Sequence, residues 1–306
     1  MIQLPEHIRT AIAKHQPIVA LESTVIAHGL PYPHNLEMAQ TLEAEVRTNH
    51  ATPATIGVVQ GQPTVGMSTA DIERFALAGT QTDQPHVSKL SRRDIAYAVA
   101  RQHDGATTVA ATMALAAMAS IQVFATGGIG GVHRGARDTW DISADLTELA
   151  RTPVLVVCAG AKSILDLPAT LEYLETLGVP VVGFGTDAFP AFYSASSGLP
   201  VPSRADTPSD IATLWRTHQQ FGGGSGMLVV VPPPTDVAIP EETIESAIEA
   251  ALARATAAKI RGQQVTPFLL ATVAEETEGE SRHTNMALLR QNARVAAHIA
   301  CALSST

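Results

Sequence analysis

A regular alternation of short apolar runs with longer helical patterns constrains the fold of this chain more than any other feature. Short, bounded runs rich in β-branched residues are typical of strands that are buried on both faces of a sheet. Alternation of strand and helix favours an α/β/α sandwich with a largely parallel sheet. Six runs predict strands: PIVAL (17–21), TIGVVQ (55–60), IQVFA (121–125), PVLVVC (153–158), PVVGF (180–184) and MLVVV (227–231).

Helical patterns fill the stretches between the predicted strands. Ser91 followed by Asp94 resembles a capping box, which marks the start of a helix. The chain contains no internal repeat and no low-complexity linker, so we expect a single domain over residues 1–306. The predicted helices cover 36–48, 91–102, 106–119, 208–220, 241–260 and, near the end of the chain, 283–302.

The charge balance argues against one class of function. The formal net charge is −9, and no basic stretch stands out, whereas binding to nucleic-acid backbones needs a positive surface. The N-terminal residues show neither a signal peptide nor a membrane helix. We therefore expect a cytoplasmic protein with no nucleic-acid or membrane partner, in which Cys158 is a buried, reduced thiol.

Polar residues gather at junctions where a predicted strand ends, which is where open α/β sheets bind ligands. Glu22 directly follows the first strand, and a half-buried carboxylate there is a candidate general acid. The alternative is a structural Glu22 whose carboxylate only accepts hydrogen bonds from the amides at a helix N-terminus.

Lys89 comes just before the helix predicted from 91, where an ammonium could hold a phosphate. A solvated surface lysine is the alternative.

The segment 126–145 follows the third strand and is the richest in polar residues and glycines. Closely spaced glycines let backbone amides approach an anion. Their spacing matches neither the dinucleotide GxGxxG nor a Walker A loop. Asp138, Asp141 and Asp145 are possible ligands for a hard cation such as Mg²⁺ or Mn²⁺. For each of them, the alternative is a structural role in a loop or as a helix cap.

Lys162 follows the fourth strand among small residues, and it is one of only four lysines in a chain whose Lys and Arg total 20. A desolvated lysine amine loses its proton readily and can attack a carbonyl to form a Schiff base, which arginine cannot readily do. A structural lysine whose stem lies along the apolar surface is the alternative.

These junctions together resemble the pseudouridine-5′-phosphate glycosidase family, also called the indigoidine synthase A family. The resemblance covers nearly the whole chain in order, and strings of this length are far more specific than a short motif. The matching strings include ALESTVIAHGLPYPHN (20–35), PATIGVVQG (53–61), KLSRRD (89–94), FATGGIGGVHRGARDTWDISADL (124–146), VCAGAKSILDLPATLEYLETLGVPVVGF (157–184) and TPFLL (266–270).

The resemblance implies a three-layer α/β/α sandwich around a mixed sheet, assembled as a homotrimer. It implies reversible cleavage of the C-glycosidic bond of pseudouridine 5′-phosphate to uracil and ribose 5-phosphate, with a divalent metal, most often Mn²⁺. Protonating a leaving oxygen, as ordinary glycosidases do, is a poor route here because the leaving atom is carbon. Opening the ribose ring and forming an iminium between its C1′ and a lysine instead creates an electron sink beside the carbon–carbon bond that breaks.

Residue by residue, the resemblance implies Lys162 as the nucleophile, Glu22 as the proton donor and Asp141 at the metal position. The sequence departs from the family pattern at Val231, Arg282 and Gln291. The implied substrate contacts are Lys89, the Val109 backbone region, Thr126, His133, Ser143, Ala144, Asp145 and Asn285.

The sequence leaves two other interpretations of the function open. A carbohydrate kinase also uses an α/β/α sandwich with Gly-rich turns and a metal, but the sequence shows no convincing nucleotide fingerprint. A non-catalytic sugar-phosphate-binding protein would leave a desolvated lysine and a buried glutamate without a purpose. Such a binder would form no imine that borohydride could trap.

Overall fold

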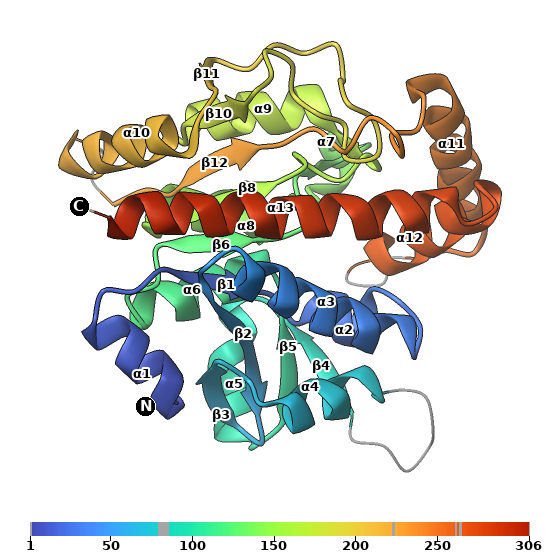
Figure 1. Ribbon diagram of the computed structural model, residues 1–306. Helices are drawn as coiled ribbons and strands as arrows, with labels where there is room; N and C mark the ends of the chain where they lie inside the picture. Colours follow the sequence, from blue (N-terminus) through green and yellow to red (C-terminus); the bar gives the residue numbers. More distant parts are fainter. Residues whose placement is uncertain (1, 79–85, 222–223, 261, 263–264, 306) are drawn as a thin grey trace.

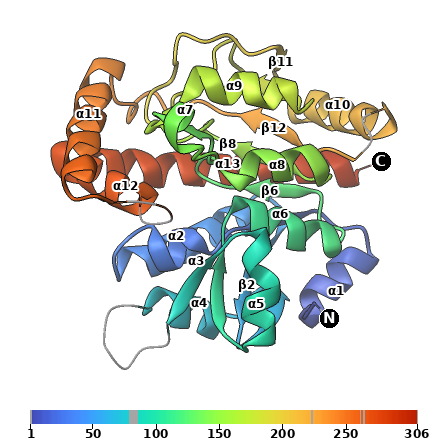
Figure 2. The ribbon, with the colours of Figure 1, turned by 180° about the vertical axis from the view of Figure 1, so that it is seen from behind.

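The computed structural model describes residues 2–78, 86–221, 224–260, 262 and 265–305. Within them the chain forms three layers, with a central sheet between two sets of helices (Figures 1 and 2). One face carries α3 (His34–Thr48), α10 (Pro208–Phe221) and α13 (Glu280–Ser304), and the other carries α6 (Val109–Met118), α8 (Ala144–Arg151) and α9 (Leu167–Thr176).

Within the described residues, ten strands form one sheet in the order β11-β10-β12-β8-β6-β1-β2-β5-β4, with β3 paired to β2. The strands from β11 to β2 run parallel, whereas β3 and β5 are antiparallel to β2. The predicted mixed, largely parallel sheet is therefore confirmed. The strands are β1 (Ile18–Leu21), β2 (Thr52–Val59), β3 (Gln62–Val65), β4 (Val87–Leu90), β5 (Asp104–Thr107), β6 (Val123–Ala125), β8 (Leu155–Cys158), β10 (Val181–Phe184), β11 (Ser203–Ala205) and β12 (Met227–Val230).

Smaller elements complete the described part of the chain. The helices α11 (Glu241–Ala257) and α12 (Val265–Glu276) stand at one end of the sheet, beside α13 (Figure 1). The short strands β7 (Val132–His133) and β9 (Leu165–Asp166) pair with each other. The remaining helices are α1 (Glu6–Ala13), α2 (Thr24–His28), α4 (Thr69–Ala76), η1 (Arg92–Asp94), α5 (Ile95–Ala100), α7 (Ala136–Thr139), α11 (Glu241–Ala257) and α12 (Val265–Glu276).

All six strands predicted from apolar runs are present. The predicted capping box is also present, and the Ser91 N–H donates to the Asp94 carboxylate at 2.9 Å. The helix predicted over 106–119 was wrong at its start, because residues 104–107 form β5 and the helix begins only at Val109. Lys89 lies inside β4, and the short helix η1 follows this strand, as predicted.

Strand ends meet from opposite directions across β2, and this is the feature that creates the site. Leu21, the last residue of β1, pairs in parallel with Thr55. On the other edge of β2, Ala106 near the end of β5 pairs in antiparallel fashion with Gly57. The carboxyl ends of β1, β6 and β8 therefore face the carboxyl ends of β4 and β5, which run the other way.

A buried hydroxyl network holds this meeting point together. The Ser23 and Thr107 hydroxyls both donate to the Ile56 carbonyl, at 2.6 and 2.7 Å. The Thr107 N–H donates to the Ser23 hydroxyl at 2.9 Å. Buried polar groups that are fully paired in this way fix local geometry. The network therefore sets Glu22, next to Ser23, relative to Thr108, next to Thr107.

No helix in the described part of the chain is long and apolar enough to cross a membrane. Cys158 is fully buried at the end of β8, and neither it nor Cys301 forms a disulfide. Burial raises the pKa of the Cys158 thiol to about 12, so it stays protonated and unreactive. The predicted buried, reduced thiol is confirmed.

Candidate active site

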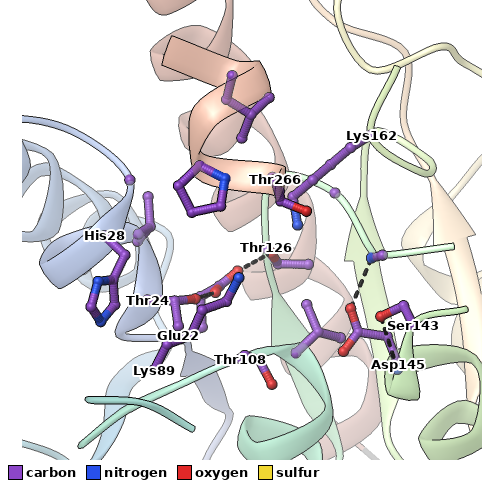
Figure 3. A pocket seen from close by; sticks show the side chains of 18 of the residues that line it. Glu22, Thr24, His28, Lys89, Thr108, Thr126, Ser143, Asp145, Lys162 and Thr266 are labelled. Atoms are coloured by element: carbon purple, nitrogen blue, oxygen red, sulfur yellow. Dashed lines mark hydrogen bonds between the residues drawn. The ribbon is translucent and has the colours of Figure 1, made fainter. Parts of the chain in front are cut away.

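A pocket of about 780 Å³ lies where the strand ends meet. Every catalytic, substrate-contacting and metal-binding residue implied by the family resemblance lines it, although these residues come from distant parts of the chain. Figure 3 shows Glu22 and Lys89 close together on one side, with Lys162 reaching in from the other. The predicted residues that line the pocket are Glu22, Lys89, Val109, Thr126, His133, Asp141, Ser143, Ala144, Asp145, Lys162 and Asn285.

The Glu22 carboxylate is held by two hydroxyl groups. Thr24 donates to Oε2, and Thr126, which follows β6, donates to Oε1 (Figure 3). Because β1 and β6 are parallel neighbours, the residues that follow them lie side by side at one edge of the sheet. Glu22 is thus a half-buried carboxyl group in a fixed orientation, and in its protonated form it could deliver a proton to one position.

Two lysines share the pocket with Glu22. Burial lowers the pKa of Lys89 below its ordinary value, and the nearby Lys162 ammonium lowers it further. The negative charges of Glu22 and Asp145 act in the opposite direction on the Lys89 pKa. An amine attacks a carbonyl only in its neutral form, so the two lysines of this partly desolvated pocket are its candidate amine nucleophiles.

The turn that carries Lys162 is held close to the glycine-rich segment. The Lys162 N–H donates to the Ile129 carbonyl at 3.1 Å, and the Ile129 N–H donates to the Gly160 carbonyl at 3.0 Å. Gly160 has φ +84°, and a Cβ there would come within 2.5 Å of the Pro190 carbonyl oxygen. Only glycine suits this position, so the small residues before Lys162 shape the turn that presents its amine.

The N-termini of two helices and Lys89 line the pocket. The Thr108 side chain accepts a hydrogen bond from the Ala111 N–H in the first turn of α6. The Ser143 side chain accepts one from the Asp145 N–H in the first turn of α8. Both helices begin at the pocket, with Thr108 of the α6 cap near Lys89 and Ser143 of the α8 cap on the other side of the view in Figure 3. An ammonium near helix N-termini suits a dianion such as a phosphate monoester, although the Asp145 carboxylate already accepts the Ala110 N–H of α6. Sequence reasoning missed Thr108, because the helix predicted over 106–119 put this N-cap threonine inside the helix.

Asp145 bridges two backbone segments. Its Oδ1 accepts the Ala110 N–H at 2.9 Å, and its Oδ2 accepts the Gly130 N–H at 2.8 Å. A Cβ on Gly130 would come within 2.8 Å of the Asp145 carboxylate, so only glycine allows this approach. Because both carboxylate oxygens bind backbone amides, Asp145 orders the walls of the pocket and is poorly suited to ligate a metal.

Of the three aspartates considered as metal ligands, Asp141 has the most suitable position. Asp138 is exposed and does not line the pocket, whereas Asp141 does, next to His133. Burial lowers the pKa of His133, and the Asp141 charge partly counteracts this. The described residues contain no group of three or more His, Cys, Asp or Glu side chains that could hold a metal. One carboxylate fits a hard cation that keeps most of its water ligands.

The far wall of the pocket comes from the C-terminal helices. Asn285 and Leu289 of α13 lie over Gly127, and the first turns of α12 add Thr266 and Leu270. Arg134, next to His133, pairs with Glu245 of α11 and donates to the Ser163 carbonyl at 3.3 Å. Arg134 thereby ties α11 to the segments that carry His133 and Lys162, and α12 packs against α11.

Known relatives cover nearly the whole chain. The family model described as indigoidine synthase A like protein matches residues 7–302. Proteins from Herpetosiphon aurantiacus and Chloroflexus aurantiacus, both named pseudouridine-5′-phosphate glycosidase, are 63% and 59% identical. The first alignment covers 99% of this chain and 98% of the relative, and the second covers 99% of each.

Two solved structures share the fold. The prealnumycin C-glycosynthase AlnA in complex with ribulose 5-phosphate is 41% identical, with a TM-score of 0.90 over 100% of this chain and 97% of that chain. An indigoidine synthase A (IdgA)-like protein from Thermotoga maritima is 36% identical, with a TM-score of 0.86 over 95% and 94%. The matching family model, the relatives and the shared fold agree, and this chain belongs to the indigoidine synthase A like family.

Proposed function

We propose that this enzyme reversibly cleaves pseudouridine 5′-phosphate to uracil and ribose 5-phosphate. The observation that carries the proposal is that Lys162 and Glu22 enter one pocket from opposite sides, beside an end suited to a phosphate. The two relatives at 63% and 59% identity carry the name of this activity. The AlnA structure, a C-glycosynthase in complex with ribulose 5-phosphate, pairs C-glycoside chemistry with a pentose phosphate on the same fold.

The substrate phosphate binds between Lys89 and the first turns of α6 and α8. The Lys162 amine, in its neutral form, adds to C1′ of the ribose as the C1′–O4′ bond opens, and O4′ takes up the proton that the attached nitrogen loses. Glu22 then protonates C5 of the uracil ring. The electrons of the C1′–C5 bond restore the C5–C6 double bond of uracil, and the nitrogen lone pair forms the imine with C1′.

Water hydrolyses the imine, which releases ribose 5-phosphate and returns the Lys162 amine. A divalent cation at Asp141, when bound, supplies positive charge that orients the polar groups of the substrate. The homotrimer, the single domain over 1–306 and the cytoplasmic location stay predictions.

Incubation of the purified protein with pseudouridine 5′-phosphate and Mn²⁺ tests the function. Free uracil, measured by chromatography, should accumulate together with ribose 5-phosphate. The reverse reaction, started from uracil and ribose 5-phosphate, should form pseudouridine 5′-phosphate. A protein that binds the substrate but releases no uracil would be a sugar-phosphate-binding protein, and phosphate transfer from ATP to a sugar would instead identify a kinase.

We predict that turnover depends on a divalent cation bound at Asp141. Chelator dialysis should abolish uracil release, and Mn²⁺ should restore it. Asp141→Asn should weaken Mn²⁺ binding by about tenfold or more, measured by titration calorimetry without substrate. Asp138→Asn is the matched control, because Asp138 is exposed and lies outside the pocket. Full activity in metal-free protein, or unchanged binding in Asp141→Asn, contradicts the prediction.

We predict that Lys89 holds the phosphate. Loss of one charge-assisted contact typically costs about 1.5–3 kcal/mol, or roughly ten- to a hundredfold in affinity. Lys89→Ala should therefore lower kcat/KM for pseudouridine 5′-phosphate by that factor. It should leave the slow reaction of unphosphorylated pseudouridine nearly unchanged, since that molecule never makes the contact. Equal losses for both substrates would show instead that Lys89 acts in the chemistry or in the fold.

A further inference from the structure

Asn292 is a buried polar residue whose hydrogen bonding is incomplete. It lies on α13 with only 1% of its surface exposed. Its Nδ2 donates to the Thr126 carbonyl at 2.8 Å and to the Gly127 carbonyl at 3.4 Å. Its Oδ1 has no hydrogen-bond partner within the described part of the chain. A buried acceptor without a partner is destabilising, so its presence calls for a compensating role.

The backbone that Asn292 binds belongs to the residue that holds Glu22. Thr126 uses its carbonyl oxygen to accept from Asn292 and its hydroxyl to donate to Glu22 Oε1. A shift of the Thr126 backbone would therefore move the hydroxyl away from the carboxylate. Asn292 does not line the pocket itself, although Asn285 and Leu289 on the same side of α13 do.

We propose that Asn292 is a positioning residue, which orients the proton donor Glu22 by fixing the segment that begins at Thr126. The proposal rests on the proposed function, since it assigns Asn292 to the step in which Glu22 protonates uracil. Groups behind a reacting side chain hold it in productive geometry. If Asn292 had only a structural role, its side chain would do no more than donate to the Thr126 carbonyl, and replacing it would slow every step of the reaction alike.

The two partial reactions separate these roles. Asn292→Leu has a similar shape and removes the amide donor. We expect it to lower kcat for uracil release by roughly 10- to 100-fold, the loss typical of groups behind a reacting residue. The trapping of ribose 5-phosphate on Lys162 by borohydride should change less than twofold, because imine formation from the free sugar needs no proton on uracil. A parallel fall in turnover and trapping would overturn the proposal.

A double-mutant cycle with Thr126→Val tests the connection directly. Valine keeps the shape of threonine and loses the hydroxyl that donates to Glu22. If Asn292 acts through that hydroxyl, Asn292→Leu should cost little further kcat in the Thr126→Val background. Fully additive losses in kcat would show that Asn292 acts independently of Thr126, and they would overturn the proposal.

Gln291 supplies a matched control on the same helix. Its Nε2 donates to the Pro232 carbonyl at 2.7 Å, and neither residue lines the pocket. Gln291→Leu therefore removes one amide-to-backbone bond of the same kind. It should lower the melting temperature to a degree comparable to Asn292→Leu and leave kcat unchanged. A loss of kcat as large as that of Asn292→Leu would mean that any disturbance of α13 slows the enzyme, which overturns the proposal.

A variant that does not fold and an enzyme with a different activity give results that differ from those of a wrong proposal. If Asn292→Leu does not fold, Asn292→Ser replaces it, since a serine hydroxyl is too short to reach the Thr126 carbonyl. The same split between turnover and trapping is expected, and equal losses count against the proposal. A failure of the proposed function would appear in the unmodified enzyme, which would then release no uracil.

Discussion

Lys162→Ala is expected to abolish uracil release and to prevent covalent capture of ribose 5-phosphate by borohydride. The reason is that the imine on Lys162 splits a difficult carbon–carbon cleavage into two easier steps, and alanine has no amine to form it. The loss of a nucleophile of this kind typically costs about 10⁶-fold in kcat. Uracil release, together with peptide mapping of the reduced adduct by mass spectrometry, measures both effects.

Lys162→Arg and Lys14→Ala are the controls for this prediction. Arginine keeps the positive charge but does not readily act as an amine nucleophile, so Lys162→Arg should be as inactive as the alanine variant. Lys14 is exposed at the end of α1 and lies outside the pocket, so its replacement should change nothing. An adduct mapped to Lys89 alone would assign the imine to the other lysine of the pocket and contradict the prediction.

The apolar strands were predictable because their signal is local. Runs such as 154–158 and 227–231 are buried on both faces of the sheet, so hydrophobicity alone marks them. The strands β4 and β5, with the sequences VSKL and DGAT, carry no such signal. They become strands because they pair with each other and β5 pairs with β2, a tertiary effect that overrides weak local preference.

The site was predictable as a set of strand-end residues but not as a geometry. Placing Glu22 and Thr126 together follows from adjacent parallel strands, yet Lys89 reaches the same pocket only because β4 runs in the opposite direction. No sequence pattern states that reversal. Asn292 was also beyond local reasoning, because its partners lie 166 and 165 residues earlier in the chain.

Glu22→Gln is expected to lower kcat for uracil release by about 10²- to 10⁴-fold, the usual contribution of a positioned general acid. Glutamine keeps the size of the side chain and can still contact Thr24 and Thr126, so the walls of the pocket should stay in place. It has no proton to give to C5 of uracil. Steady-state kinetics at saturating Mn²⁺ measure the loss.

The partial reaction makes this prediction specific to the proton donor. Borohydride should still trap ribose 5-phosphate on Lys162 in Glu22→Gln, whereas Lys162→Ala traps none, so the two variants fail at different steps. Glu37→Gln serves as the matched control, since Glu37 is an exposed carboxylate on α3 outside the pocket. If Glu22→Gln keeps full turnover, the proton must come from another group in the pocket, and His133 is the next to replace. If it loses trapping together with turnover, Glu22 is needed to form the imine, and its role moves from protonating uracil to preparing the Lys162 amine.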